Sequence, residues 1–190
     1  MSELKILFAG DDHTVDQIID LQRKNLRKNL SPEEISSQGF VFVEHDPITL
    51  KKICATEPAV IARDGDTLAG YAICMNKAYG VNVPELVDLF QHLDAIVYNG
   101  NSLKDSNYLV CGQLCVAKGY RGQNLAGKLY GHMSLLNRKY PYCVTDVSDN
   151  NQRSLHAHLR RGFEIIKSFT NDQGELWHIV LWDWNKNQEI

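Results

Sequence analysis

The fold of this chain is decided by one stretch, Leu114-Cys115-Val116-Ala117-Lys118-Gly119-Tyr120-Arg121-Gly122-Gln123-Asn124-Leu125-Ala126-Gly127-Lys128-Leu129. An apolar run from Tyr108 to Val116 predicts a strand, and after a short basic turn a helix opens with no acidic residue in its first turn. The first N–H groups of a helix lack partners and carry partial positive charge, so the pattern indicates a phosphate or pyrophosphate site. Arg121 adds a fixed cation with forked donors that suit phosphate. The alternative is an ordinary strand-to-helix turn that needs Gly122 for its backbone.

A second pattern lies further along the chain, Asn151-Gln152-Arg153-Ser154-Leu155-His156-Ala157-His158-Leu159-Arg160-Arg161-Gly162-Phe163. It follows a short predicted strand, Cys143 to Val147, and a polar cluster at 148–150 that suits the N-terminus of a helix. We expect this helix to end at Gly162, where a left-handed C-cap fits, and the next strand to begin at Phe163.

The two patterns, in this order, resemble the GNAT superfamily of N-acyltransferases, which use acetyl-CoA. The first family motif is a strand followed by Arg/Gln-x-x-Gly-x-Gly/Ala, and the second is roughly Asn-x-x-Ala/Ser, then Tyr or His, closing with Gly-Phe. The matching segments here are Arg121-Gly122-Gln123-Asn124-Leu125-Ala126 and the set Asn151, Ser154, His158, Gly162 and Phe163. The chain departs at Asn124, where the family usually has Gly. Because Asn tolerates left-handed geometry, we expect the turn to survive, with a side chain that either crowds the pyrophosphate or bonds to it.

The resemblance implies a set of residues that bind acetyl-CoA. The backbone of Leu114, Cys115 and Val116 would pair with the pantetheine arm and polarise the thioester carbonyl. The helix start would hold the pyrophosphate through Arg121, Gly122, Gln123, Asn124, Leu125, Ala126 and Gly127. Asn151 would bond the pantetheine arm or the loop backbone. No metal is expected.

Two side chains are candidates for proton transfer. The acceptor amine, with a pKa near ~10.4, must attack unprotonated, and the departing thiolate needs a proton. His158 occupies the position where many relatives have the tyrosine that protonates the thiolate, and an imidazole can do this at neutral pH. Asp146 has the spacing of a glutamate that, in some protein N-terminal acetyltransferases of the family, receives the amine proton, here directly or through water. The alternatives are a histidine that only packs or hydrogen-bonds and an aspartate that caps the following turn.

The rest of the chain alternates helix and strand. Strands are predicted at 4–9, 59–63, 68–76, 108–116, 143–147, 163–170 and 176–183, and helices at 12–29, from 31, 46–55, 84–95, from about 125 through Leu136, and 150–162. Hairpin turns are predicted at 64–66 and 171–174, and Ser31 with Pro32 predicts the capped start of the second helix. Phe40 to Val43 forms either a small strand or a packed connection. The resemblance implies the GNAT fold, an α/β domain over residues 1–190 whose mixed, mostly antiparallel sheet carries helices on both faces.

Residues 77–107 are longer than the tight connection usual in the family. The segment contains the predicted helix 84–95, flanked by loop-like sequence at 79–80 and 99–102. Acidic residues Glu85, Asp88 and Asp94 on that helix suggest a cationic amine substrate, and the alternative is an ordinary acidic surface helix. Long insertions are often lids or binding loops, and the alternative is a surface embellishment or an oligomer contact.

Composition limits the remaining possibilities. The chain has 190 residues, 44% of them hydrophobic, and suits one compact domain. It has no apolar run of membrane-spanning length and no secretory signal, and its five scattered cysteines indicate reduced thiols in a cytoplasmic protein. The net charge of −3 gives no reason to expect nucleic acid as a partner.

The expected function is acetyl-CoA-dependent N-acetyl transfer to a primary amine of a small molecule or peptide, by direct attack in a ternary complex, in a monomer or homodimer. The alternative is a catalytically silent acyl-CoA-binding module, for which Asn124 and the absent tyrosine at position 158 are the arguments. The acceptor amine cannot be identified from the sequence.

Overall fold

The computed structural model describes residues 4–186, with Val81 and Asn82 described by their backbone alone. The chain divides into two compact units. The first unit comprises Met1–Met75 and Cys111–Leu135, and the second comprises Asn76–Val110 and Leu136–Ile190. Strand β6 (Tyr108–Val116) contributes its first residues to the second unit and the rest to the first.

The first unit is built on strands β1 (Lys5–Ala9), β2 (Ala59–Asp64) and β3 (Thr67–Asn76), which pair antiparallel in that order. The predicted hairpin between β2 and β3 is confirmed, and its turn contains Gly65 with φ 58°. The second half of β6 lies beside β3, and just after it the Ala117 N–H donates to the Ala69 carbonyl at 2.9 Å.

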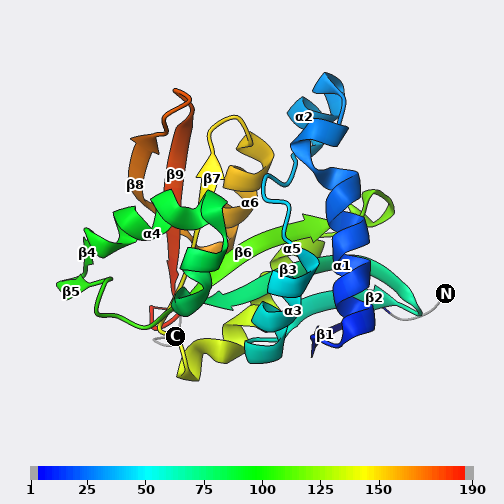
Figure 1. Cartoon of the computed structure of the whole chain (residues 1–190), viewed down its shortest axis with the longest axis horizontal. Coiled ribbons are helices and arrows are strands. Elements are labelled where there is room, and N and C mark those ends of the chain that lie inside the picture. The colour runs from blue at the N-terminus through cyan, green and yellow to red at the C-terminus, as the bar shows by residue number, and fades with distance from the viewer. Residues whose placement is uncertain (1–3, 187–190) are drawn as a thin grey trace. The chain divides into compact units, whose positions relative to one another are not determined.

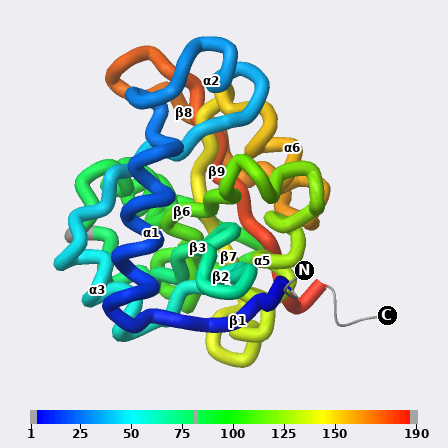
Figure 2. Tube along the Cα trace, turned by 90° about the vertical axis from the view of Figure 1, so that its right-hand side faces the viewer, coloured from blue at the N-terminus to red at the C-terminus, as the bar shows by residue number. Residues whose placement is uncertain are grey.

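Helices cover both faces of these strands (Figures 1 and 2). Helices α1 (Asp12–Asn25) and α3 (Pro47–Thr56) lie on one face, and α5 (Leu125–Met133) lies on the other. Gly70 of β3 faces α5, since a Cβ there would lie 3.4 Å from the Leu129 side chain. The short helix α2 (Pro32–Gln38) begins as predicted, with Pro32 in its first turn and a capping box between Ser31 and Glu34.

The sequence prediction for α1 was too long. Leu26 has extended geometry (φ −60°, ψ 134°) and forms an isolated parallel bridge with Val41, so α1 ends at Asn25 and only a 3₁₀ turn follows, at Arg27–Asn29. The segment at 40–43 is therefore a packed connection. Leu26 and Val41 are both buried, and this tertiary pairing overrides the local helical periodicity. Similarly, α5 ends at Met133 and a 3₁₀ segment, Ser134–Arg138, continues the chain.

The second unit contains β7 (Tyr142–Ser148), β8 (Glu164–Thr170) and β9 (Leu176–Asp183), in the order β6-β7-β9-β8. Tyr108–Val110 of β6 run parallel to β7, and the other two pairings are antiparallel, so the sheet is mixed. The closing hairpin of β8 and β9 is as predicted.

Strand register assigns side chains to two faces of this sheet. Asp146 pairs with Ile179, which pairs in turn with Lys167, and directly opposed residues share a face. We call this side the Asp146 face. Cys143 pairs with Trp182, and these two residues lie three positions from Asp146 and Ile179 along their strands. Because side chains alternate between faces along a strand, Cys143 and Trp182 lie on the opposite face, which we call the Trp182 face. Helix α6 (Gln152–Arg161) lies on the Trp182 face, where the Arg161 guanidinium sits 4.6 Å from the ring of Trp182.

The insertion at 77–107 covers the Asp146 face. Its helix is shorter than predicted, with a 3₁₀ turn at Pro84–Leu86 followed by α4 (Val87–Asp94). The sequence predicted a loop at 99–102, but Asn99 (φ 48°) and Gly100 (φ 80°) instead form the turn of a small hairpin, β4 (Val97–Tyr98) with β5 (Asn101–Ser102).

Two aromatic contacts attach the insertion to the sheet. His92 of α4 packs on Phe169 of β8 with ring centroids 4.2 Å apart, and Tyr98 of β4 packs edge-on against Tyr142 of β7 at 5.5 Å. By strand register, Phe169 and Tyr142 both lie on the Asp146 face.

The five cysteines are buried and free of disulfides, as the sequence predicted. Within residues 4–186, no helix is both long enough and apolar enough to cross a membrane.

Candidate active site

The turn between β6 and α5 is the predicted phosphate site. Gly122 has φ 80°, and Asn124 has φ 54° and ψ 31°, so both are left-handed. The expectation that Asn124 would preserve this geometry is confirmed. A Cβ on Gly122 would meet no described atom within 4 Å, so the surroundings of the turn are open.

The start of α5 presents unused hydrogen-bond donors. The Asn124 side chain accepts no bond from the helix, and the first turn contains no acidic residue. The N–H groups of Leu125, Ala126 and Gly127 therefore have no partner within the helix and carry the positive end of its dipole. Gln123 and Asn124 are exposed, and the Asn124 side chain folds over the helix, with Oδ1 2.5 Å from where a Cβ on Gly127 would lie. This arrangement suits an oxyanion such as pyrophosphate.

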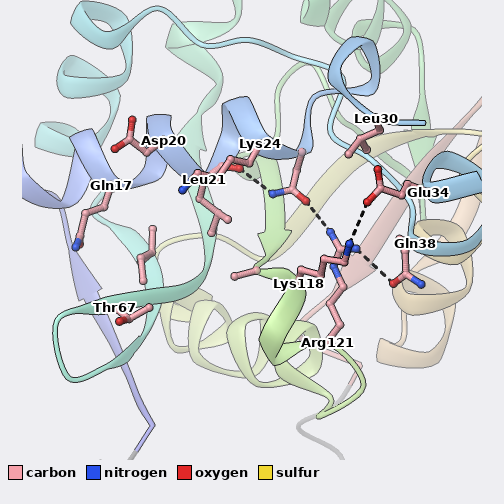
Figure 3. A pocket seen from close by; sticks show the side chains of 13 residues that line it. Gln17, Asp20, Leu21, Lys24, Leu30, Glu34, Gln38, Thr67, Lys118 and Arg121 are labelled. Atoms are coloured by element: carbon pink, nitrogen blue, oxygen red, sulfur yellow. Dashed lines mark hydrogen bonds and ion pairs between the residues drawn. The ribbon is translucent and has the colours of Figure 1, made fainter. Parts of the chain in front are cut away.

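Arg121 is engaged within the first unit. Its Nε donates to the Val116 carbonyl at 3.2 Å, and its terminal nitrogens donate to Gln38 Oε1 at 3.3 Å and Asn25 Oδ1 at 2.6 Å (Figure 3). The residue therefore connects the turn to α1 and to the end of α2. A phosphate at Arg121 would share these donors or displace a partner.

A cavity of about 500 Å³ adjoins Arg121 in the first unit (Figure 3). It carries three basic side chains, Lys24, Lys118 and Arg121, together with the carboxylates of Asp20 and Glu34. Lys118 and Glu34 form an exposed ion pair at 3.2 Å. Sequence reasoning missed this cavity because α1 and α2 contribute most of its wall and neither carries a motif known for ligand binding.

The strand before the turn is held tightly in place. A Cβ on Gly70 would lie 2.9 Å from the Cys115 carbonyl oxygen, so β3 approaches β6 closely there. Burial raises the pKa of the Cys115 thiol to about 12, which makes that thiol unreactive at neutral pH. Leu114 and Val116 are half-buried. Cofactor binding through the backbone of Leu114, Cys115 and Val116 stays a prediction.

In the second unit, Asp146 is the predicted proton acceptor. Its pKa is raised to about 7, chiefly by burial and to a smaller extent by the negative charge of Asp88 on α4. A carboxyl group with this pKa is ionised to a substantial extent at neutral pH and is still basic enough to accept a proton. The contribution of Asp88 was not foreseen, because it depends on the packing of the insertion over the Asp146 face.

His158 is a buried, neutral imidazole. Its Nδ1 lies 2.7 Å from the Ser154 carbonyl oxygen, and because a carbonyl can only accept, the ring proton is on Nδ1. Nε2 then carries the lone pair. Burial lowers the pKa of His158 to about 4, and the ring packs edge-on against Phe163 at 5.1 Å.

Asn151 is the N-cap of α6, where its Oδ1 accepts a bond from the Ser154 N–H at 3.4 Å. The expected cap among residues 148–150 was one residue or more too early. Asp149 instead contacts His178 at 3.0 Å.

Asp146 and His158 are not brought together, because Asp146 lies on the Asp146 face of the sheet and α6 lies on the opposite Trp182 face. Among the described residues, no group of three or more His, Cys, Asp or Glu side chains could hold a metal ion.

Comparison with known proteins agrees with this geometry. The family model described as "Acetyltransferase (GNAT) family" matches residues 29–163. A search of curated protein sequences finds no match.

Solved structures show the same fold. One is the NatC complex bound to Gag peptide and CoA, with a TM-score of 0.64 and 13% identity over 95% of this chain and 98% of that one. Another is a GNAT-family acetyltransferase from Streptococcus agalactiae, with a TM-score of 0.60 and 20% identity over 95% of each chain. A third is Arabidopsis thaliana NAA60 in complex with acetyl-CoA, with a TM-score of 0.59 and 13% identity over 95% of this chain and 99% of that one. Since the family model spans most of the sequence and includes both motifs, the chain belongs to the GNAT acetyltransferase family.

Proposed function

We propose that this protein transfers the acetyl group of acetyl-CoA to a primary amine of a small molecule or peptide, by direct attack of the amine on the thioester in a ternary complex. The observation that carries the proposal is the left-handed turn at Gly122 and Asn124, which leaves the first N–H groups of α5 open to a pyrophosphate. Membership of the GNAT acetyltransferase family supports the acetyl donor, and relatives of the same fold have been solved with CoA or acetyl-CoA.

In this proposal, Asp146 removes the first proton. The acceptor arrives as an ammonium ion, since alkyl amines have a pKa near ~10.4. Because Asp146 and α6 lie on opposite faces of the sheet, Asp146 takes this proton through water, before the amine reaches the thioester and His158. With its pKa raised to about 7, Asp146 accepts the proton and then passes it to solvent. The free amine then attacks the thioester carbonyl carbon, and the carbonyl π electrons move to oxygen.

His158 handles the second proton. The tetrahedral intermediate holds a cationic nitrogen that must lose a proton before or as the C–S bond breaks, and the sulfur departs as a thiolate. Because Nδ1–H is committed to the Ser154 carbonyl, Nε2 is the atom that takes the proton from nitrogen and delivers it to sulfur. The products are the N-acetylated amine and CoA with a free thiol, and His158 returns to its neutral form.

The test combines binding and turnover. Calorimetry with acetyl-CoA measures cofactor binding, and release of free thiol across a panel of alkyl amines, diamines and peptides with free N-termini measures transfer. We expect micromolar binding and thiol release with at least one amine class, confirmed by mass increase of the acceptor. Binding without release by any amine would favour the catalytically silent acyl-CoA-binding module, and absence of binding would remove the cofactor assignment itself.

A further inference from the structure

A buried polar network crosses the core of the first unit. Gln22 of α1 is fully buried, and His45, just before α3, is 4% exposed. Gln22 Oε1 accepts a hydrogen bond from the His45 backbone N–H at 2.8 Å, and Gln22 Nε2 lies 3.3 Å from His45 Nδ1. Beside them Gln113 of β6 donates to the Val43 carbonyl at 2.8 Å and accepts from the Tyr71 hydroxyl.

This network fixes the tautomer of His45. The backbone N–H of His45 can only donate, so the atom of Gln22 that it meets is the amide oxygen. The other end of the Gln22 amide is then an NH₂ group, which donates to His45 Nδ1. Nδ1 is therefore the acceptor nitrogen, and the ring proton is on Nε2. Burial lowers the pKa of His45 to about 4, so the ring stays neutral at physiological pH.

The Nε2–H group of His45 has no hydrogen-bond partner among the described residues. Buried donors are almost always paired, so an unpaired one in a native structure needs an explanation, and a catalytic role is one of the recognised explanations. The group is directed at β6, where a Cβ on Gly112 would lie 3.8 Å from Nε2. Gly112 therefore presents only backbone to this donor, and the side chain of Ile73 borders the same position at 3.5 Å.

Gly112 lies on the strand that, two residues later, reaches the backbone assigned to the pantetheine arm and the thioester, Leu114–Val116. We propose that His45 is a further catalytic residue, whose Nε2–H donates a hydrogen bond to the thioester carbonyl oxygen of acetyl-CoA beside Gly112. This inference rests on the proposed function. When the amine attacks, this oxygen becomes an oxyanion, and a fixed, neutral donor in a dry site stabilises it without reorganisation. Gln22 is then a positioning residue, because it keeps the proton on Nε2.

The direct test is nuclear magnetic resonance of protein with ¹⁵N-labelled histidine, with the His45 signals assigned through His45→Gln. In the free protein we expect a neutral ring protonated on Nε2. Acetyl-CoA should shift the Nε2–H signal downfield, and CoA, which has the same pantetheine arm but no carbonyl, should not. Equal responses to acetyl-CoA and CoA, both bound by calorimetry, would overturn the role of His45 and leave the proposed function standing. If neither compound binds, the proposed function fails first.

A kinetic test uses thiol release with an amine found active in the panel. His45→Phe should lower kcat by about 10²- to 10³-fold with acetyl-CoA affinity nearly unchanged, the range for loss of one oxyanion donor. Gln22→Leu should give a smaller loss of kcat and, in the labelled protein, a mixture of His45 tautomers. Tyr71→Phe is the matched control, since it removes a hydroxyl from the same network without touching His45, and should keep most of the activity. If Tyr71→Phe costs as much as His45→Phe in variants with native melting temperatures, the network is only structural and the proposal is wrong.

Discussion

The Arg121 guanidinium donates to Asn25 Oδ1 at 2.6 Å, so the basic residue of the β6–α5 turn also connects that turn to α1. A guanidinium that donates three internal hydrogen bonds stabilises the folded chain, in addition to any interaction with a bound anion. Arg121→Ala should therefore lower the free energy of unfolding by about 1–3 kcal/mol, the range for charged hydrogen bonds, and should also weaken acetyl-CoA binding. Urea unfolding and calorimetry measure the two effects separately.

Asn25→Ala separates the two roles of Arg121. It removes the 2.6 Å acceptor but leaves the cation in place, so it should lower stability and leave acetyl-CoA affinity within about twofold. If Asn25→Ala weakens acetyl-CoA binding as much as Arg121→Ala does, Arg121 acts on the cofactor only by holding the turn in shape.

Negative charge at the turn should weaken acetyl-CoA binding. Gln123→Glu and Asn124→Asp place a carboxylate at the positive end of α5, where the phosphates are expected, and should raise the dissociation constant by about 3- to 30-fold. Gln173→Glu makes the same change in the exposed turn between β8 and β9 and should leave the constant unchanged. Equal affinities for all three variants would exclude the cradle.

The side chain of Asn124 should be energetically coupled to position 127. Gly127→Ala would place a Cβ 2.5 Å from Asn124 Oδ1, so the asparagine must move and the alanine should bring little or no stability. In the Asn124→Gly background the obstacle is gone, and Gly127→Ala should stabilise by up to about 1 kcal/mol through helix propensity. A double-mutant cycle by urea unfolding measures the coupling free energy between the two positions. A coupling free energy of zero would contradict the contact. Asn124→Gly alone should leave acetyl-CoA affinity unchanged or improve it.

Several of the structural features that these variants test could be predicted from the sequence. Local signals predicted local geometry correctly: the capping box at Ser31, the hairpin turn at Gly65 and the left-handed Asn124 each depend on a few neighbouring residues. The family motifs predicted the β6–α5 turn and the α6 helix on the same basis.

What sequence reasoning missed depends on residues distant along the chain. Helix α1 ends because Leu26 pairs with Val41. The hydrogen bonds of Arg121 depend on acceptors from two other helices, Asn25 of α1 and Gln38 of α2. The orientation of His45 is fixed by Gln22, which periodicity would place simply on the apolar face of a helix. Such contacts have no local pattern, since tertiary packing determines them.

The pH dependence of the reaction should report on Asp146 and Asp88. If Asp146 is the base, kcat/KM should rise with pH through about 7. Asp88→Asn removes a negative charge that raises this pKa, so the rise should move to lower pH. Glu85→Gln, another loss of negative charge in the insertion, should leave the profile in place. A profile unchanged in Asp88→Asn would contradict the assignment of the rise to Asp146.

The same group should affect stability in the opposite direction. The pKa of Asp146 is raised on folding, so the native state holds a proton that the unfolded chain has released. This stabilisation is fully present below the unfolded pKa of about 3.9 and is lost as pH rises through about 7. Asp146→Asn should therefore flatten the fall in stability over this window, which thermal melts at several pH values would detect, while it abolishes the rise in kcat/KM.

His158 distinguishes an enzyme from a silent binding module. If its Nε2 carries the proton to the thiolate, His158→Phe should lower kcat by about 10- to 10⁴-fold with acetyl-CoA affinity nearly unchanged, since the thioester end contributes little to binding. His158→Tyr restores the residue common in the family and should keep substantial activity, because the CoA thiol, with a pKa near ~8.5, requires only a modest acid. His156→Phe is the control on the same helix, and its exposed side chain should be dispensable.

Stability provides the internal check on His158. Because burial lowers its folded pKa to about 4, the neutral ring contributes stability above the unfolded pKa of about 6.5, which is lost as pH falls through about 4. His158→Phe should remove this part of the loss of stability in acid. This effect is measured by unfolding and is independent of the activity assay. Equal losses of kcat in His158→Tyr and His158→Phe would indicate that the ring packs against Phe163 and does no chemistry. Full activity in His158→Phe would remove the residue from the mechanism and leave sulfur to be protonated by water.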